Sequence, residues 1–191
     1  MSKGLIANSF PTPVRLTVLD KTFVPYFDTE KIATRVGELA TQISTDYAGK
    51  KPLFLGILNG SFIFAADLFR QITVEAEISF VKLASYKGVT STGNVVTAIG
   101  LEESLHDRHV IIVEDIIDTG RTMSSFLKEV ARQGPASVRI ATFLSKPDAL
   151  QAPDLKADYV GFEIPNRFVL GYGLDYDGYG RNTRELYVLE D

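Results

Sequence analysis

Residues 110–123 read Val-Ile-Ile-Val-Glu-Asp-Ile-Ile-Asp-Thr-Gly-Arg-Thr-Met. The β-branched run from Val110 to Val113 predicts a strand buried on both faces, as central strands of a parallel sheet are. Glu114, Asp115 and Asp118 then bring three acids into five residues. Because like charges at one strand end repel one another, we expect a cation or the hydroxyl groups of a ligand between them rather than a solvated loop.

The residues after the first two acids form a turn suited to anions. Asp118-Thr119-Gly120-Arg121-Thr122 offers a glycine hinge, two threonine hydroxyls and backbone N–H groups. A helix is predicted to begin here, because apolar residues recur at helical spacing at Met123, Phe126, Leu127 and Val130. N–H groups at a helix start bind phosphate. The G-x-x-x-x-G-K-[ST] spacing is absent, which argues against a nucleoside triphosphatase.

The composition is that of one globular domain with room for a small appendage. The chain has 191 residues, of which 45% are hydrophobic, and no cysteine, so disulfides are excluded and an intracellular compartment is favoured. The net charge is −4 without a lysine-arginine block, so we expect no nucleic-acid or acidic-membrane partner. No secretory signal or membrane-spanning stretch is evident, and we expect a soluble cytoplasmic protein.

Helix and strand patterns alternate along the chain. Apolar spacing predicts a helix that begins at Asp28 or Thr29 and stops before Gly49. Strand patterns lie at 52–58, 78–85, 95–99, 138–144, 159–164 and 186–189. Residues 14–27 alternate only loosely and contain Pro25, which favours an edge strand or an extended arm.

Several connections have two interpretations. Asn59-Gly60-Ser61 follows the first buried strand and is either a plain turn or a ligand loop, because open α/β sheets bind ligands at the carboxyl ends of their strands. Lys146 lies on the same predicted edge as the acids. Residues 86–94 are polar and contain two glycines, so they form either a simple hairpin connection or a lid. The aromatic, glycine-rich residues 168–181 form either a packed loop or a stacking surface for a flat heterocycle.

In combination these features resemble the hypoxanthine-guanine branch of the type I phosphoribosyltransferase family, over about residues 15–190. The motifs that carry the resemblance are 110–123, Leu58-Asn59-Gly60-Ser61, Ser85-Tyr86, Lys146 and Phe168-Val169 through Asp175. It implies an α/β fold with a mostly parallel twisted sheet flanked by helices. It also implies a single domain, with a core at about 28–165 and a small hood from the two chain ends, at about 1–27 and 166–191.

The resemblance implies purine salvage, in which 5-phosphoribosyl diphosphate and a 6-oxopurine give a nucleoside monophosphate and pyrophosphate, with Mg²⁺. It also implies a homodimer or homotetramer. Two alternatives stay open: a phosphoribosyltransferase for another base such as xanthine or a pyrimidine, and a regulator that keeps the site only to sense phosphoribosyl diphosphate.

Carried over residue by residue, the resemblance assigns the phosphoribosyl diphosphate site to Leu58, Asn59, Gly60, Ser85, Tyr86, Glu114, Asp115, Asp118, Thr119, Gly120, Arg121, Thr122 and Arg181. It assigns the purine site to Ile116, Lys146, Phe168, Val169 and Asp175, and the metal site to Glu114, Asp115 and Asp175. Asp118 matches the catalytic acid/base beside the purine's N7. Lys146 matches the donor to O6, and Phe168 matches the aromatic residue that stacks on the base.

Two positions depart from the family pattern. Asn59 stands where several relatives carry lysine, which removes a cation from the pyrophosphate loop. Arg121 replaces a common lysine, and we expect a mild effect because the phosphate cradle consists mainly of backbone. In the family the peptide within the Leu58–Gly60 loop is often cis.

Overall fold

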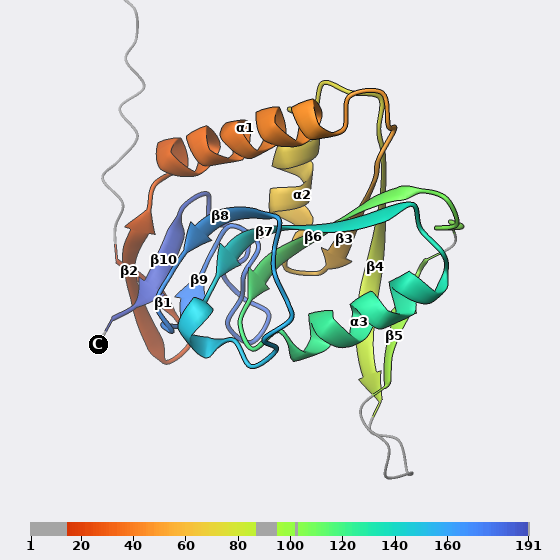
Figure 1. Cartoon of the computed structure of the whole chain (residues 1–191). Coiled ribbons are helices and arrows are strands. Elements are labelled where there is room, and N and C mark those ends of the chain that lie inside the picture. The colour runs from red at the N-terminus through yellow and green to blue at the C-terminus, as the bar shows by residue number, and fades with distance from the viewer. Residues whose placement is uncertain (1–14, 87–94, 102, 191) are drawn as a thin grey trace, which may run out of the picture.

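The computed structural model describes residues 15–86, 95–101 and 103–190, and it contains two sheets (Figure 1). The larger sheet has six strands in the order β5-β4-β3-β6-β7-β8, and β5 alone is antiparallel to its neighbour. Its strands are β3 (Leu53–Leu58), β4 (Glu77–Tyr86), β5 (Val95–Ile99), β6 (His109–Ile117), β7 (Ser137–Ser145) and β8 (Tyr159–Glu163). Flanking helices are α1 (Thr29–Asp46), α2 (Phe62–Phe69) and α3 (Arg121–Arg132). This confirms the predicted fold class.

The central strand β6 builds a core on each face of the sheet. Residues Val110 to Val113 are fully buried. Ile111 and Val113 join the cluster that contains the apolar faces of α1 and α2, while Val110 and Ile112 join the cluster that contains α3. Side chains alternate between the faces of a strand, so an unbroken β-branched run satisfies both cores at once. Figure 1 shows α1 and α2 on one side of the sheet and α3 on the other.

The smaller sheet is the hood, and it joins the two ends of the chain. Its order is β1-β2-β10-β9, from β1 (Leu16–Val18), β2 (Lys21–Phe27), β9 (Val169–Leu170) and β10 (Leu186–Leu189). In Figure 1 it lies on the side toward which β6, β7 and β8 point. Phe23, Leu170 and Tyr187 form its small core. Among the helices that the structure describes, none is long and apolar enough to cross a bilayer.

One expectation about the hood was wrong. The segment at 14–27 is not an edge strand or arm throughout, because β2 lies between β1 and β10. Pro25 is opposite Tyr187 where the register shifts, and such an irregularity accommodates a residue that cannot donate a backbone hydrogen bond. At the start of the aromatic segment 168–181, Val169 and Leu170 form a short strand and pair with Val188 and Tyr187 of β10.

A short helical turn, η1 (Pro147–Ala149), follows β7 and was not predicted. It begins directly after Lys146, where the proline cannot continue the strand. The Lys146 N–H donates to the Ile117 carbonyl at 2.9 Å. The end of β7 is thereby held against the end of β6.

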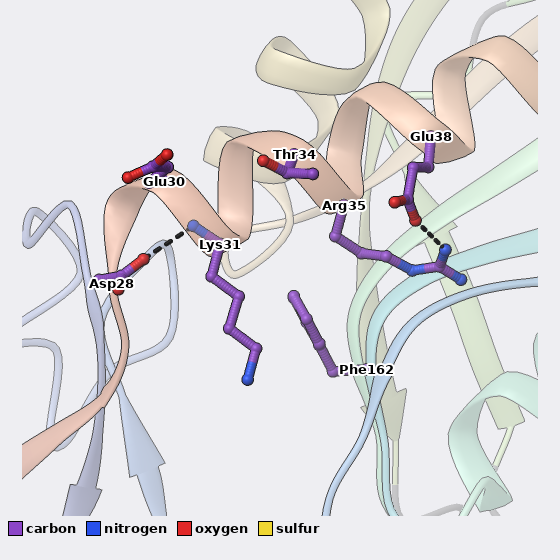
Figure 2. A pocket seen from close by; sticks show the side chains of 7 residues that line it. All are labelled: Asp28, Glu30, Lys31, Thr34, Arg35, Glu38 and Phe162. Carbon is purple, nitrogen blue, oxygen red and sulfur yellow. Dashed lines mark hydrogen bonds and ion pairs between the residues drawn. The ribbon is translucent and has the colours of Figure 1, made fainter.

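Helix α1 is attached to the outer edge of the sheet. Asp28 caps its first turn by accepting from the Lys31 N–H at 2.7 Å. Arg35 donates to the carbonyls of Val160 and Gly161 in β8, at 2.8 Å each. A shallow pocket of about 390 Å³ lies between this helix and Phe162, and Figure 2 shows the side chains that line it. None of the residues that line it belongs to the predicted site. The Arg35 side chain bonds Glu38 and β8, and Lys31 Nζ lies over the rings of Phe27 and Phe162.

We expect Gly161→Ala to destabilise the fold. A Cβ at this position would lie 2.4 Å from the Phe143 carbonyl oxygen of β7, so the two strands would have to move apart. Overpacking of this kind costs about 1–3 kcal/mol. Urea unfolding measures the loss.

Gly37→Ala in α1 is the matched control. Its Cβ would meet only the end of the flexible Gln71 side chain, at 3.1 Å, and alanine gains about 1 kcal/mol over glycine within a helix. The control should therefore be neutral or stabilising. Equal effects of the two substitutions would show that the β7–β8 contact does not require glycine.

Candidate active site

The two acids at 114 and 115 lie within β6, which continues four residues past Val113 to Ile117. Asp115 accepts from the Ile116 N–H at 2.8 Å. Glu114 is half-buried as a residue, but its Oε2 is fully covered and has no hydrogen-bond partner. Burial, followed by the Asp115 charge, raises the pKa of Glu114 well above its ordinary value. Burial raises the pKa of Asp115 to about 6.

An uncompensated carboxylate at the end of a central strand indicates a missing cation or hydroxyl partner. Among the described residues, no group of three or more His, Cys, Asp or Glu lies close enough to form a protein cage for a metal. A pair of carboxylates nevertheless fits Mg²⁺, which uses one or two carboxylates together with water and substrate phosphates. Glu114 and Asp115 therefore fit the predicted metal site, and we expect the substrate to supply the remaining ligands.

The predicted phosphate turn follows β6 and encloses a cavity of about 200 Å³. Gly120 precedes α3 with a φ of +73°, in the left-handed region that favours glycine. The lining residues are Glu114, Ile116, Ile117, Asp118, Thr119, Gly120, Arg121, Thr122 and Met123. The first turn of α3 thus places free N–H groups and hydroxyls around a space suited to an anion.

A second cavity, of about 230 Å³, shares Ile116 and Asp118 with the first. Its lining residues are Asp115, Ile116, Asp118, Lys146, Phe168, Val169, Leu174 and Asp175. The Lys146 side chain is 8% exposed, and its Nζ lies 3.3 Å from Asp118 Oδ2. This cavity brings together every residue assigned to the purine site.

The loop after β3 lies directly against the acids. Its Leu58–Asn59 peptide is cis. A Cβ on Gly60 would lie 1.4 Å from Asp115 Oδ2, and a Cβ on Gly173 would lie 2.1 Å from the Gly60 carbonyl oxygen. Only glycine permits backbone this close to a carboxylate and to another backbone segment.

Ser61, which completes the quoted motif, does not point into either cavity. It is fully buried, and its hydroxyl donates to the Ile57 carbonyl at 2.6 Å. Of the two interpretations of Asn59-Gly60-Ser61, the serine therefore fits the plain structural turn, while Gly60 lies at the site.

Arg181 and Asp175 form an ion pair at the hood side of the site. Their closest atoms, Arg181 Nη2 and Asp175 Oδ1, are 2.6 Å apart. Arg181 Nη1 also donates to the Gly173 carbonyl at 2.7 Å. The structure therefore places Arg181 at the predicted edge of the site, with its guanidinium engaged by the loop that carries Asp175.

Two contacts in the site escaped the sequence analysis. Asn166 Oδ1 lies 3.4 Å from Lys146 Nζ, and Leu174 lines the second cavity. A single asparagine in a loop gives no signal of its own, because the contact joins residues 20 positions apart. The predicted residues Ser85 and Tyr86 end β4, where their backbones pair with Val96 and Val95. The proposed lid at 86–94 lies, from residue 87 on, outside the described residues.

The comparisons with known proteins agree with one another. The model of the phosphoribosyl transferase domain matches residues 25–177. The hypoxanthine-guanine phosphoribosyltransferase of Streptococcus mutans serotype c is 41% identical over 167 residues, which cover 86% of this chain and 92% of that protein. The corresponding protein of Lactococcus lactis is 43% identical over 162 residues, which cover 84% and 87%.

Solved structures give the same result. The crystal structure of a hypoxanthine phosphoribosyltransferase from Staphylococcus aureus is similar with a TM-score of 0.81 and 37% identity, over 87% of this chain and 91% of that chain. By its family model, its relatives and its fold, the chain belongs to the hypoxanthine-guanine phosphoribosyltransferases of the type I phosphoribosyltransferase family.

Proposed function

We propose that this chain, as a single domain, transfers the 5-phosphoribosyl group from phosphoribosyl diphosphate to N9 of hypoxanthine or guanine, giving IMP or GMP and pyrophosphate. The observation that carries the proposal is the cavity shared by Lys146, Asp118 and Phe168, which adjoins the phosphate turn. We further propose that the enzyme works in the cytoplasm as a homodimer or homotetramer.

Lys146 and Asp118 suit one edge of a 6-oxopurine. That edge presents O6 and N7 side by side, and the two side chains lie 3.3 Å apart. Lysine has three protons and no acceptor, so it donates to O6 and favours oxopurines over adenine, whose amino group offers no acceptor at that position. Phe168 is 42% exposed as a residue and is supported by the rings of Phe23 and Tyr176, and it can stack on the base. The backbone of Val169 and the Asp175 region meet the purine's N1 and C2 edge.

Asp118 is the catalytic residue in this proposal. As the bond from N9 to the ribose forms, positive charge develops on the purine and the N7 proton becomes acidic. A carboxylate beside N7 accepts that proton, which helps more in the transition state than in the ground state. Because Lys146 is within 3.3 Å of the same carboxylate, its charge keeps Asp118 oriented toward this edge of the base.

The remaining residues hold the sugar phosphate. Thr119, Gly120, Arg121 and Thr122 surround the 5′-phosphate with N–H groups and hydroxyls, and Glu114 and Asp115 accept from the ribose hydroxyls. Glu114, Asp115 and Asp175 would hold Mg²⁺, which would supply positive charge to offset the charge on the leaving diphosphate. Leu58, Asn59, Gly60 and Arg181 enclose the diphosphate, and Ser85 and Tyr86 complete that side.

A direct assay tests the function. The purified chain is incubated with phosphoribosyl diphosphate, magnesium and one base at a time: hypoxanthine, guanine, xanthine, adenine or uracil. Nucleotide should form with hypoxanthine or guanine and not with adenine or uracil. Formation only from xanthine or uracil would support a different base specificity. Binding of phosphoribosyl diphosphate without any nucleotide formation would favour the sensing regulator.

Asp118→Asn should lower turnover with hypoxanthine by roughly 10²-fold or somewhat less, the range of a lost acid/base. Affinity for phosphoribosyl diphosphate should change little, because asparagine is nearly isosteric and still accepts from Lys146. Steady-state kinetics with both substrates measure kcat and the two KM values separately. If Asp118 only shapes the turn, asparagine should replace it without kinetic loss, so wild-type turnover and pH dependence would contradict the assignment.

Lys146→Ala should collapse the preference for hypoxanthine over adenine, with the ratio of the two kcat/KM values falling by about 10²-fold or more. Lys128→Ala, on the exposed side of α3, is the control and should leave the ratio unchanged. An unchanged ratio in Lys146→Ala would show that another group reads O6.

Glu114→Gln should weaken binding of phosphoribosyl diphosphate but stabilise the ligand-free protein. A folded-state carboxyl with a raised pKa favours folding below the unfolded pKa, and this contribution is lost as pH rises through the folded pKa. Glutamine does not ionise, so the stability of the Glu114→Gln variant relative to wild type should increase from pH 5 to pH 8. We expect about 1 kcal/mol at pH 8, or about 2–4 °C in Tm for a chain of this size.

Scanning calorimetry in excess chelator measures this difference. Glu129→Gln, on the surface of α3 and paired with Arg132, is the matched control and should show no such widening. A Glu114→Gln variant less stable than wild type at pH 8 would mean that the carboxylate has a partner in the folded protein.

A further inference from the structure

The turn from Gly171 to Leu174 connects β9 to the Asp175 loop and has an unusual backbone. Gly171, Tyr172 and Gly173 have φ angles of 101°, 48° and 103°. The N–H groups of Tyr172 and Gly173 donate to the carbonyls of Thr183 and Arg181 at 3.1 and 3.0 Å. The turn is therefore fixed to the segment that carries Arg181.

This turn also touches the pyrophosphate loop. A Cβ on Gly173 would lie 2.1 Å from the Gly60 carbonyl oxygen, so the two backbones are in direct contact. The Gly173 N–H is already donated to Arg181, which means that the contact with Gly60 is van der Waals packing. Such packing alone gives little directional control over the position of the loop.

A directional contact joins the same turn to α2, the helix that follows the loop. Tyr172 is 5% exposed and packs against Phe143, with ring centroids 4.7 Å apart. Its hydroxyl donates to Asp67 Oδ2 at 2.9 Å. Asp67 belongs to α2, the helix that begins directly after the Asn59–Gly60 loop. Burial and the neighbouring Asp67 raise the pKa of Tyr172 well above its ordinary value, so the hydroxyl remains a donor at physiological pH.

We infer that Asp67 and Tyr172 are a positioning pair for the diphosphate end of the substrate, an inference that rests on the proposed function. The pair ties α2 to the 171–174 turn and so fixes Gly60 relative to Asp175 and Arg181. Gly60 and Arg181 are assigned only to the diphosphate, whereas Asp175 is assigned to the metal and also to the purine's N1 and C2 edge. Loss of the pair should therefore weaken binding of phosphoribosyl diphosphate more than binding of a nucleoside monophosphate, which carries no diphosphate.

Hydrogen bonds to a charged acceptor are among the stronger ones. The Asp67 side chain is 42% exposed, so water can replace the tyrosine hydroxyl at the carboxylate when the bond is removed. The expected consequence is a local displacement of the turn rather than unfolding of the domain.

The test compares two tyrosine hydroxyls that both donate to an aspartate. Tyr172→Phe removes the bond to Asp67, whereas Tyr159→Phe removes a 2.7 Å bond to Asp46. Tyr172→Phe should raise the KM and the calorimetric Kd for phosphoribosyl diphosphate with magnesium by about 5–10-fold, with kcat within about twofold and a clearly smaller rise in the Kd for IMP. Tyr159→Phe should leave all four values within about twofold, even where it lowers Tm.

Substitutions at Asp67 provide a second, independent test. Asp67→Asn keeps an acceptor and should retain most of the affinity for phosphoribosyl diphosphate, while Asp67→Ala should lose as much as Tyr172→Phe. The double variant should lose no more than either single one, because both remove the same bond. If Tyr172→Phe fails to fold, the comparison of Asp67→Ala with Asp67→Asn decides the question.

An unchanged Kd for phosphoribosyl diphosphate in Asp67→Ala or in folded Tyr172→Phe, or an equal loss of IMP affinity, would overturn the positioning role. Nucleotide formation by the wild type is measured separately. If the wild type forms no nucleotide, the proposed function is wrong, whereas the calorimetric comparison still tests the pair.

Discussion

The candidate site is built around a carboxylate that the fold alone does not satisfy. Glu114 sits in β6, between β3 and β7, and its Oε2 is covered without a hydrogen-bond partner. The apolar run Val110–Val113 packs into both cores and offsets the cost of burying this charge. A ligand with hydroxyls or a cation would remove this cost, so the end of the central strand β6 favours such a ligand. The Glu114 carboxylate therefore lowers the stability of the ligand-free protein and raises its affinity for the ligand.

The parallel sheet explains why residues distant in sequence meet at the site. The carboxyl ends of β3, β6 and β7 lie on one edge, and each is followed by one part of the machinery: Gly60, Asp118 and Lys146. The hood brings Phe168 over the same edge. The candidate site on this fold is therefore formed by the connections after the strands together with Glu114 and Asp115 at the end of β6.

The sequence predicted features that depend on local pattern and failed where tertiary contacts decide. The β-branched run and the acids after it indicated β6 and its site, because hydrophobic period and charge crowding are properties of consecutive residues. Pro25 indicated an edge strand, and this was wrong because a register shift opposite Tyr187 accommodates the proline inside the hood sheet. The bond between Asp67 and Tyr172 joins residues 105 positions apart, and neither residue carries a local signal for it.

The ion pair between Arg181 and Asp175 shows how the site is balanced without substrate. The Arg181 charge lowers the pKa of Asp115 and the Asp175 charge raises it, and burial outweighs both. A diphosphate attracts Arg181 and repels Asp175, whereas a divalent cation does the reverse. Metal and diphosphate arriving together would therefore draw the two side chains apart, each toward its own partner. The Gly173 N–H donates to the Arg181 carbonyl at 3.0 Å, while the Asp175 carboxylate also accepts from the Gly178 N–H at 2.6 Å. This exchange of partners would therefore break side-chain hydrogen bonds of both residues and could leave the backbone bond of Arg181 in place.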